Sequence, residues 1–156
     1  MGVEIERKFL VKDESWRKGA TGTRYRQGYL SNNKQRSVRV RIGGRKAFLT
    51  IKGMSRGASR DEFEYKIPTT DAEALLKLCL RPLIEKVRYR LKIGRLTWEI
   101  DDFEGKNRGL VLAEIELPSE DHPLKLPPWA GQEVTHDPRY YNSNLVTHPY
   151  TTWPRT

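Results

Sequence analysis

The chain has 156 residues, of which 37% are hydrophobic, 31% charged and 10% aromatic, and this composition excludes a disordered chain. No apolar run approaches the roughly 20 residues that cross a bilayer, and the single cysteine, Cys79, cannot form an internal disulfide. We therefore expect a cytoplasmic protein with no membrane anchor. Residues 1–156 are predicted to form one domain, with strands over about 2–118 and a connector and helix over 119–156.

The net charge is strongly basic and unevenly placed. Lys and Arg total 29 against 20 Asp and Glu, which gives +9, and residues 1–66 hold 17 basic against 7 acidic side chains. Cationic surfaces concentrate anions, so this excess indicates a nucleic-acid backbone or a small polyphosphate as partner. An ordinary solvated surface is the alternative.

Alternation of polar and apolar residues with period two dominates the chain before residue 118, and it is the pattern of strands with one polar face. In Val38–Ile42, for example, Arg39 and Arg41 project from the same face. The pattern predicts eight strands near 2–12, 23–31, 36–43, 46–53, 60–67, 84–93, 96–103 and 110–117. Turn residues between them, such as those at 43–44, predict antiparallel neighbours in a meander.

Two helices are predicted. A capping box from Thr70 to Glu73 starts the first, which ends before Pro82. After a Pro-rich connector, Asp137 is predicted to cap a second helix that runs through Leu145. The residues from 147 to 156 show no period, and we expect them to be loosely held.

Acidic residues recur on the polar face as pairs two residues apart, which places two carboxylates about 7 Å apart. The pairs are Glu4 with Glu6, Glu62 with Glu64, Glu99 with Asp101, and Glu114 with Glu116. Like charges this close repel, and a divalent cation with a preference for hard oxygen ligands, such as Mg²⁺ or Mn²⁺, relieves the repulsion.

Basic residues cluster on the same strands, and most are arginines, whose planar donors match phosphate oxygens. They are Lys8, Arg39, Arg41, Lys52, Arg60, Lys86, Arg88 and Arg90. If the eight strands close into a barrel with this face inward, acids and bases share one lumen that needs ligands, metals or water. Closure turns the apolar faces outward, where helices or a second subunit must cover them, so a homodimer is a candidate arrangement.

Several segments of the sequence resemble those of a known family. The segment Glu4-Ile-Glu6-Arg-Lys8 resembles the N-terminal ExExK signature of the CYTH family, the triphosphate tunnel metalloenzymes, and is most similar in pattern to short bacterial tripolyphosphatases. The similarity continues through the Arg39/Arg41 strand and Glu114-Ile-Glu116 to the tail at about residue 145. It implies a mainly β (α+β) fold: a closed eight-stranded antiparallel tunnel with a charged lumen and a few covering helices.

The resemblance also implies a metal-dependent reaction on a linear triphosphate, most simply hydrolysis of inorganic tripolyphosphate with Mg²⁺ or Mn²⁺. By similarity, the metal ligands are Glu4, Glu6, Glu114 and Glu116, and the catalytic residues are Lys8 and Lys86. Substrate-binding residues are Arg39, Arg41, Lys52, Arg60, Lys86 and Arg88, and Glu62, Glu64 and Asp101 are additional acids of the lumen. Adenylate cyclase of the class IV type and thiamine triphosphatase remain alternative activities, because one fold supports several reactions.

A non-catalytic module that holds polyphosphate or RNA is the rival from another class. Such modules use bases together with aromatic stacking platforms. Four acidic pairs on the same face would repel a nucleic-acid backbone unless metal were present, so nucleic acid is disfavoured as partner.

Overall fold

The structure, a computed structural model, describes residues 2–154. Its nine strands form one antiparallel sheet. They are β1 (Gly2–Val11), β2 (Thr21–Asn33), β3 (Arg36–Gly43), β4 (Lys46–Gly53), β5 (Ser59–Ile67), β6 (Ile84–Ile93), β7 (Leu96–Phe103), β8 (Val111–Glu116) and β9 (Ala130–Glu133). The first eight confirm the predicted strands to within a few residues, whereas β9 was not predicted.

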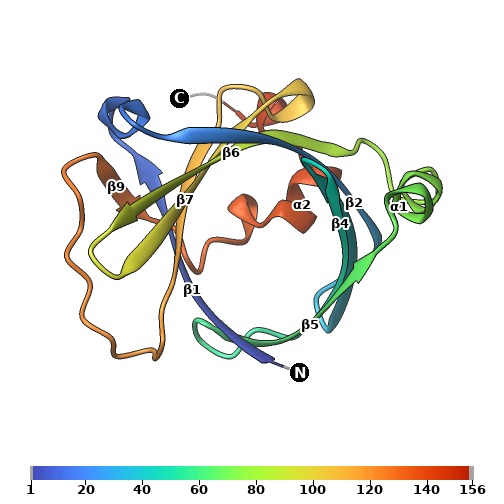
Figure 1. Cartoon of the computed structure of the whole chain (residues 1–156), viewed down its shortest axis with the longest axis horizontal. Helices are drawn as coiled ribbons and strands as arrows, with labels where there is room; N and C mark the ends of the chain where they lie inside the picture. Colours follow the sequence, from blue (N-terminus) through green and yellow to red (C-terminus); the bar gives the residue numbers. More distant parts are fainter. Residues whose placement is uncertain (1, 155–156) are drawn as a thin grey trace.

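Pairing of the first strand on both sides closes the sheet. The strand order is β5-β4-β3-β2-β6-β7-β8-β1, and β1 also pairs with β5, which completes the predicted eight-stranded antiparallel barrel. Figure 1 shows these strands as a ring. The N-terminal part of β1 places Glu4 opposite Arg60 of β5, and the next residues place Glu6 opposite Glu116 of β8. Further along β1, β9 takes over the edge that β5 leaves.

Two apolar clusters cover the outside of the barrel, as closure with a polar interior requires. Helix α1 (Thr69–Leu76) packs its Ala72 and Leu76 against Val40 and Ala47 of β3 and β4. On the other side, a cluster around Trp98 joins β1, β7 and β8 to Trp16 of the short 3-10 helix η1 (Ser15–Arg17) and to the connector that follows β8. Trp98 packs edge-on against Phe9 and Trp129, with ring centroids 5.6 and 5.2 Å away.

The C-terminal region fills one end of the barrel interior, which the sequence pattern did not predict. Helix α2 (Asn142–Thr147) lies within the ring of strands (Figure 1). Its Leu145 and Val146 belong to a third apolar cluster that includes Ile84, Phe103 and Leu112. We call residues 138–147, which comprise the 3-10 helix η3 (Pro138–Tyr140) and α2, the plug segment. The lumen is therefore polar over only part of its length.

The predicted capping box is wrong. Helix α1 begins at Thr69, directly after Pro68, and no side chain caps it. The cap is Pro68, two residues before the predicted Thr70, so Thr70 lies inside the first turn. Glu73 instead accepts a hydrogen bond from Arg26 of β2 at 2.7 Å.

The predicted C-terminal helix is divided in two. Asp137 does accept a hydrogen bond from the Arg139 backbone N–H, as expected of a cap, but η3 ends at Tyr140 because Tyr141 is extended.

The prediction of a loosely held tail is wrong for the described residues, which end at residue 154. The Trp153 ring packs edge-on against Tyr140 at 5.1 Å. Two further 3-10 helices are η2 (Gly105–Asn107) and η4 (Tyr150–Thr152); residues 155 and 156 lie outside the described part. None of the described helices has the length and apolarity to cross a membrane.

Candidate active site

The lumen is a cavity of about 330 Å³ between the inward-facing side chains of the strands and the N-terminal end of α2. Every site residue predicted from sequence except Asp101 lines it: Glu4, Glu6, Lys8, Arg39, Arg41, Lys52, Arg60, Glu62, Glu64, Lys86, Arg88, Glu114 and Glu116. Closure of the barrel thus brings together residues from β1, β3, β4, β5, β6 and β8. Cations and carboxylates occur in the same cavity.

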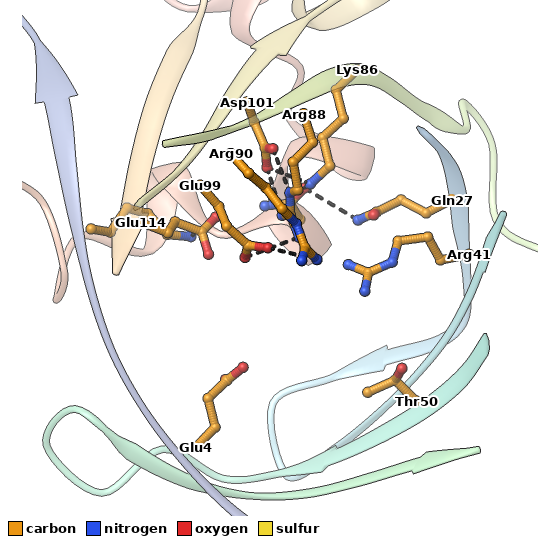
Figure 2. A network of polar contacts seen from close by, with 12 residues as sticks. Glu4, Gln27, Arg41, Thr50, Lys86, Arg88, Arg90, Glu99, Asp101 and Glu114 are labelled. Carbon is orange, nitrogen blue, oxygen red and sulfur yellow. Dashed lines mark hydrogen bonds and ion pairs between the residues drawn. The ribbon is translucent and has the colours of Figure 1, made fainter. Parts of the chain in front are cut away.

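Asp101 lies behind the lining and binds two of its cations. This fully buried carboxylate receives two hydrogen bonds from Arg88, at 2.8 and 2.9 Å, and lies 2.7 Å from the Lys86 Nζ (Figure 2). Burial alone would raise the pKa of Asp101, but Arg88 and Lys86 outweigh it and lower the pKa. Burial lowers the pKa of Lys86 to about 8, although Asp101 opposes that shift.

The arginines of β3 are only weakly neutralised. The Nη2 atoms of Arg39 and Arg41 each lie 3.7 Å from the Glu64 carboxylate, and Arg39 also donates to the Thr50 hydroxyl at 3.3 Å. Burial, followed by repulsion from Arg39 and Arg88, lowers the pKa of Arg41 to about 10. Among the described residues, the Arg39 Nε is a buried donor without a hydrogen-bond partner. This part of the lumen therefore has donors available for an anion.

A tyrosine supports two of these guanidinium groups. The Arg41 and Arg88 guanidinium carbons lie 5.0 and 5.1 Å from the centre of the Tyr25 ring, within the range of cation–π attraction. The ring packs directly over Gly43, where a Cβ atom would lie 2.5 Å from it. A side chain at position 43 would displace the ring and with it the two arginines.

Three carboxylates meet in another part of the lumen. Oxygen atoms of Glu4, Glu62 and Glu116 lie within 4.8 Å of one another, and we call these residues the carboxylate cluster. Lys52 neutralises Glu4, with its Nζ 2.8 and 3.0 Å from the two oxygens. Burial, followed by the charge of Glu4, raises the pKa of both Glu62 and Glu116. Hard oxygen donors with uncompensated negative charge fit a divalent cation.

Glu6 and Glu114, which the sequence grouped with Glu4 and Glu116, interact with each other through a side-chain hydrogen bond. Burial, and then the charges of Glu114 and Glu4, raise the pKa of Glu6 well above its usual range. Burial alone would raise the pKa of Glu114, but the charge of Lys8 outweighs burial and lowers the pKa of this carboxylate. The Lys8 Nζ lies 3.9 Å from the Glu114 carboxylate. The pKa values of Glu6 and Glu114 are thus shifted in opposite directions.

The remaining charges surround these groups. The Arg60 guanidinium donates twice to the Gly53 carbonyl, at 3.2 and 3.0 Å, which fixes it beside the cavity. Glu99 lies 3.3 Å from Arg88 and 3.2 Å from Arg90 (Figure 2).

Sequence reasoning missed several polar residues of the lumen. Tyr141 and Asn142 of the plug segment line the cavity, as does Tyr29, and Gln27 lies fully buried behind Asn142. The strand sequences do contain a pattern that indicates the plug segment. The inward series Glu4-Glu6-Lys8, Lys86-Arg88-Arg90 and Glu114-Glu116 continue at the same end of the barrel with Leu10, Ile84 and Leu112, which belong to the third apolar cluster. An apolar residue at the end of each polar series indicates that something apolar fills the interior there.

Comparisons with known proteins agree with this architecture. The CYTH domain family matches residues 2–150. An inorganic triphosphatase of Acetivibrio thermocellus is 53% identical over 151 residues, covering 96% of this chain and 97% of its own length. An inorganic triphosphatase of Nitrosomonas europaea is 40% identical, covering 92% and 96%. A crystal structure of an inorganic triphosphatase shares 34% identity with a TM-score of 0.64 and covers 99% of both chains.

An eight-stranded barrel with acids and bases facing inward is the architecture of a tunnel protein for charged ligands. The match over residues 2–150 and the two relatives show more than that: the chain belongs to the CYTH family. A protein from Pyrococcus horikoshii at 23% identity and a TM-score of 0.61 has the same fold.

The carboxylate cluster predicts a divalent-cation response. We expect Mg²⁺ or Mn²⁺ to raise the thermal unfolding midpoint, because the cation relieves repulsion among three carboxylates in the folded state only. Glu62→Gln is expected to lose most of this rise, since a neutral amide oxygen is a poorer ligand. Glu85→Gln, the same change at an exposed position on β6, is the control and keeps the full rise. An equal rise in both variants would contradict a cation site at the cluster.

The buried Asp101 predicts a stability effect with a defined pH dependence. Asp101→Asn leaves Lys86 and Arg88 without their shared countercharge and is expected to cost about 3–5 kcal/mol of unfolding free energy in urea. Asp102→Asn, which loses a half-exposed ion pair with Arg17 at 3.0 Å, should cost about 1 kcal/mol or less.

The pKa of Asp101 is depressed in the folded state, so its stabilisation is present above the usual value of 3.8 and is lost as the pH falls. The difference between wild type and Asp101→Asn should therefore shrink below about pH 4. A difference that stays constant down to pH 2 would contradict the ion-pair account.

Proposed function

We propose that this protein is a divalent-metal-dependent hydrolase of linear triphosphates, with inorganic tripolyphosphate as substrate. The observation that carries the proposal is the division of one cavity into the carboxylate cluster and a set of buried, incompletely neutralised cations. The two relatives named inorganic triphosphatase support the substrate class. The proposed unit is the single domain of residues 1–156, in the cytoplasm.

The basic side chains would hold the phosphate chain. Arg39, Arg41 and Arg88 present planar donors to the lumen, and charge-assisted hydrogen bonds to phosphate are about twice as strong as neutral ones. Asp101 fixes the Arg88 guanidinium with two hydrogen bonds, so this donor loses little side-chain entropy when the substrate binds. Lys52 and Arg60 extend the basic lining toward the carboxylate cluster.

Mg²⁺ or Mn²⁺ is the proposed cofactor, and Glu4, Glu62 and Glu116 would hold it. Their oxygen atoms are close together, and burial, followed by the charge of Glu4, raises the pKa of Glu62 and Glu116, so the donor set fits a hard cation. When bound, the cation supplies neutralisation of phosphate oxygens and a lowered pKa of water. Glu6 and Glu114, predicted as ligands from sequence, lie beside the cluster and would contribute negative charge next to Lys8.

Lys86 and Lys8 are the proposed catalytic residues. The pKa of Lys86, lowered to about 8 by burial, leaves its ammonium able to give a proton from Nζ to the leaving phosphate oxygen near neutral pH. The pKa of Lys8 is raised, because Glu114 and Glu6 outweigh burial, so Lys8 stays charged and neutralises developing negative charge. Phosphoryl transfer needs mainly positioning and electrostatic stabilisation, so a protein nucleophile is unnecessary.

The substrate preference is tested by phosphate release from tripolyphosphate, ATP, thiamine triphosphate and pyrophosphate with Mg²⁺ or Mn²⁺. We expect tripolyphosphate to be turned over fastest and EDTA to abolish turnover. Formation of cyclic AMP from ATP would favour the adenylate cyclase alternative. Preference for thiamine triphosphate would favour the thiamine triphosphatase alternative. Full activity in EDTA would contradict the metal requirement.

Binding is tested separately from chemistry by calorimetry with tripolyphosphate in EDTA. Arg41→Ala removes a charge-assisted contact and is expected to weaken binding by about 1.5–3 kcal/mol. Arg45→Ala removes the same charge from the exposed turn between β3 and β4 and should leave affinity near the wild-type value. Equal affinities of the two variants would contradict binding of phosphate by the Arg41 side chain.

A further inference from the structure

The plug segment contacts both lysines proposed as catalytic, although these lie far apart in the sequence. The Lys8 Nζ of β1 donates to the Tyr140 carbonyl at 3.3 Å. The Lys86 Nζ of β6 donates to the Asn142 Oδ1 at 2.8 Å. A stretch of three residues therefore supplies one acceptor to each ammonium group.

The contacts of Lys86 fix how its ammonium group is oriented. An ammonium carries three N–H donors in a rigid arrangement. One donor is directed to the Asp101 carboxylate at 2.7 Å and a second to Asn142. Lys86 also lines the cavity, with its Nζ 5.3 Å from the centre of the Phe103 ring, and the third donor is the one left for a ligand. With two acceptors in place the ammonium cannot rotate freely, and with only one it can.

The orientation of the Asn142 amide is itself determined by its neighbours. The Gln27 Nε2 donates to the same Oδ1 atom at 3.2 Å, and Gln27 is fully buried. Figure 2 shows the Gln27 amide directed toward the Lys86 ammonium, and the two residues lie on the neighbouring strands β2 and β6. A rotated Asn142 amide would present its NH₂ group to two donors and leave both without an acceptor, which is unfavourable for buried polar groups.

The plug segment is in turn tied to the barrel by Asn107 of η2. This buried side chain donates to the Leu145 carbonyl at 3.4 Å and accepts from the Tyr150 backbone N–H at 2.8 Å. Leu145 and Val146 pack against the barrel interior. The placement of Asn142 is therefore set by the packing of Leu145 and Val146 and by the hydrogen bond from Asn107.

We propose that Asn142 is a positioning residue for triphosphate hydrolysis: by accepting a hydrogen bond from the Lys86 Nζ, it directs the free N–H of Lys86 into the lumen. The inference rests on the proposed function. It assigns to the C-terminal segment a role in catalysis through Lys86, in addition to its packing role.

Three variants test the inference. Asn142→Leu keeps the side-chain volume but removes the acceptor, and we expect kcat for tripolyphosphate to fall on the order of 10- to 100-fold, the scale that loss of orientation costs. Asn142→Asp keeps the acceptor and adds charge. Asn144→Leu, the matched control, makes the same change on the same helix at a side chain that donates to the Pro138 carbonyl and does not contact Lys86. It should change kcat by no more than about 3-fold, because loss of that hydrogen bond affects stability first.

A second readout follows Lys86 directly and needs no turnover: the pH titration of its Cε resonance by NMR. The groups that face the Lys86 ammonium are Asp101, Arg88 and Glu114 in addition to Asn142. Because a hydrogen bond to the charged form favours it, Asn142→Leu should lower the pKa of Lys86, Asn142→Asp should raise it, and Asn144→Leu should leave it unchanged. The alkaline limb of the activity profile should move in the same directions.

The outcomes separate the inference from the proposed function. Wild-type turnover together with unchanged kcat and unchanged Lys86 titration in Asn142→Leu overturns the inference alone. If Asn142→Leu does not fold, an unchanged Lys86 titration in Asn142→Asp overturns it equally. Failure of the wild-type protein to bind or hydrolyse tripolyphosphate overturns the proposed function, and the inference with it.

Discussion

Balance among buried charges is the constraint on which this structure depends. A charge taken out of water is costly unless a partner and hydrogen bonds compensate it, and a closed barrel with an inward polar face buries many charges at once. Asp101 compensates Lys86 and Arg88 at hydrogen-bond distance, and Lys52 compensates Glu4. Other groups are less well compensated, so the cavity carries excess charge in two places, of opposite sign.

Those two places follow from how the barrel closes. The first strand lies between β5 and β8, so Glu4, Glu62 and Glu116 converge although up to 112 residues separate them along the chain. The basic groups lie mostly on β3 and β6, which both neighbour β2. A polyanion bound along the lumen would meet cations along its length and the carboxylate cluster at one part of it. That arrangement favours an anion together with a divalent cation over either one alone.

The plug segment makes the two ends of the barrel interior different. Leu145 and Val146 bury apolar surface against Ile84 and Leu112, which removes roughly 25 cal/mol of unfavourable hydration for each Å² buried. The same segment brings Tyr140 and Asn142 to Lys8 and Lys86. Apolar packing therefore stabilises the fold and holds polar acceptors at fixed positions in the lumen.

Much of the fold was predictable because a closed antiparallel barrel keeps strict alternation along every strand. In Val38–Ile42 the arginines face inward and the apolar residues outward, as the period requires. Strand β9 was not predictable, since its four residues, Ala130–Glu133, show no alternation and pair only because β5 leaves the edge of β1. Local sequence also cannot show that Pro68 starts α1 or that Tyr141 divides the C-terminal helix.

For the site, side-chain parity along the strands predicted most of the residues that share the lumen, and Asp101, which lies behind the lining, is the exception. Parity could not predict which carboxylates meet, because that depends on register across the closing pair of strands. Glu62 lies with Glu4 and Glu116, whereas Glu6 hydrogen-bonds to Glu114. Asn142 was not predicted, for a similar reason. Its role depends on how the plug segment packs and not on the pattern of a strand.

Anomalous diffraction from crystals grown with Mn²⁺ and a non-hydrolysable tripolyphosphate analogue would locate both the cation and the phosphate chain. We expect an anomalous peak in contact with Glu4, Glu62 and Glu116, and a phosphate chain in the lumen against Arg39, Arg41 and Arg88. A manganese peak away from the carboxylate cluster, or an analogue bound only on the outer surface, would contradict the proposed sites of the cation and the phosphate chain.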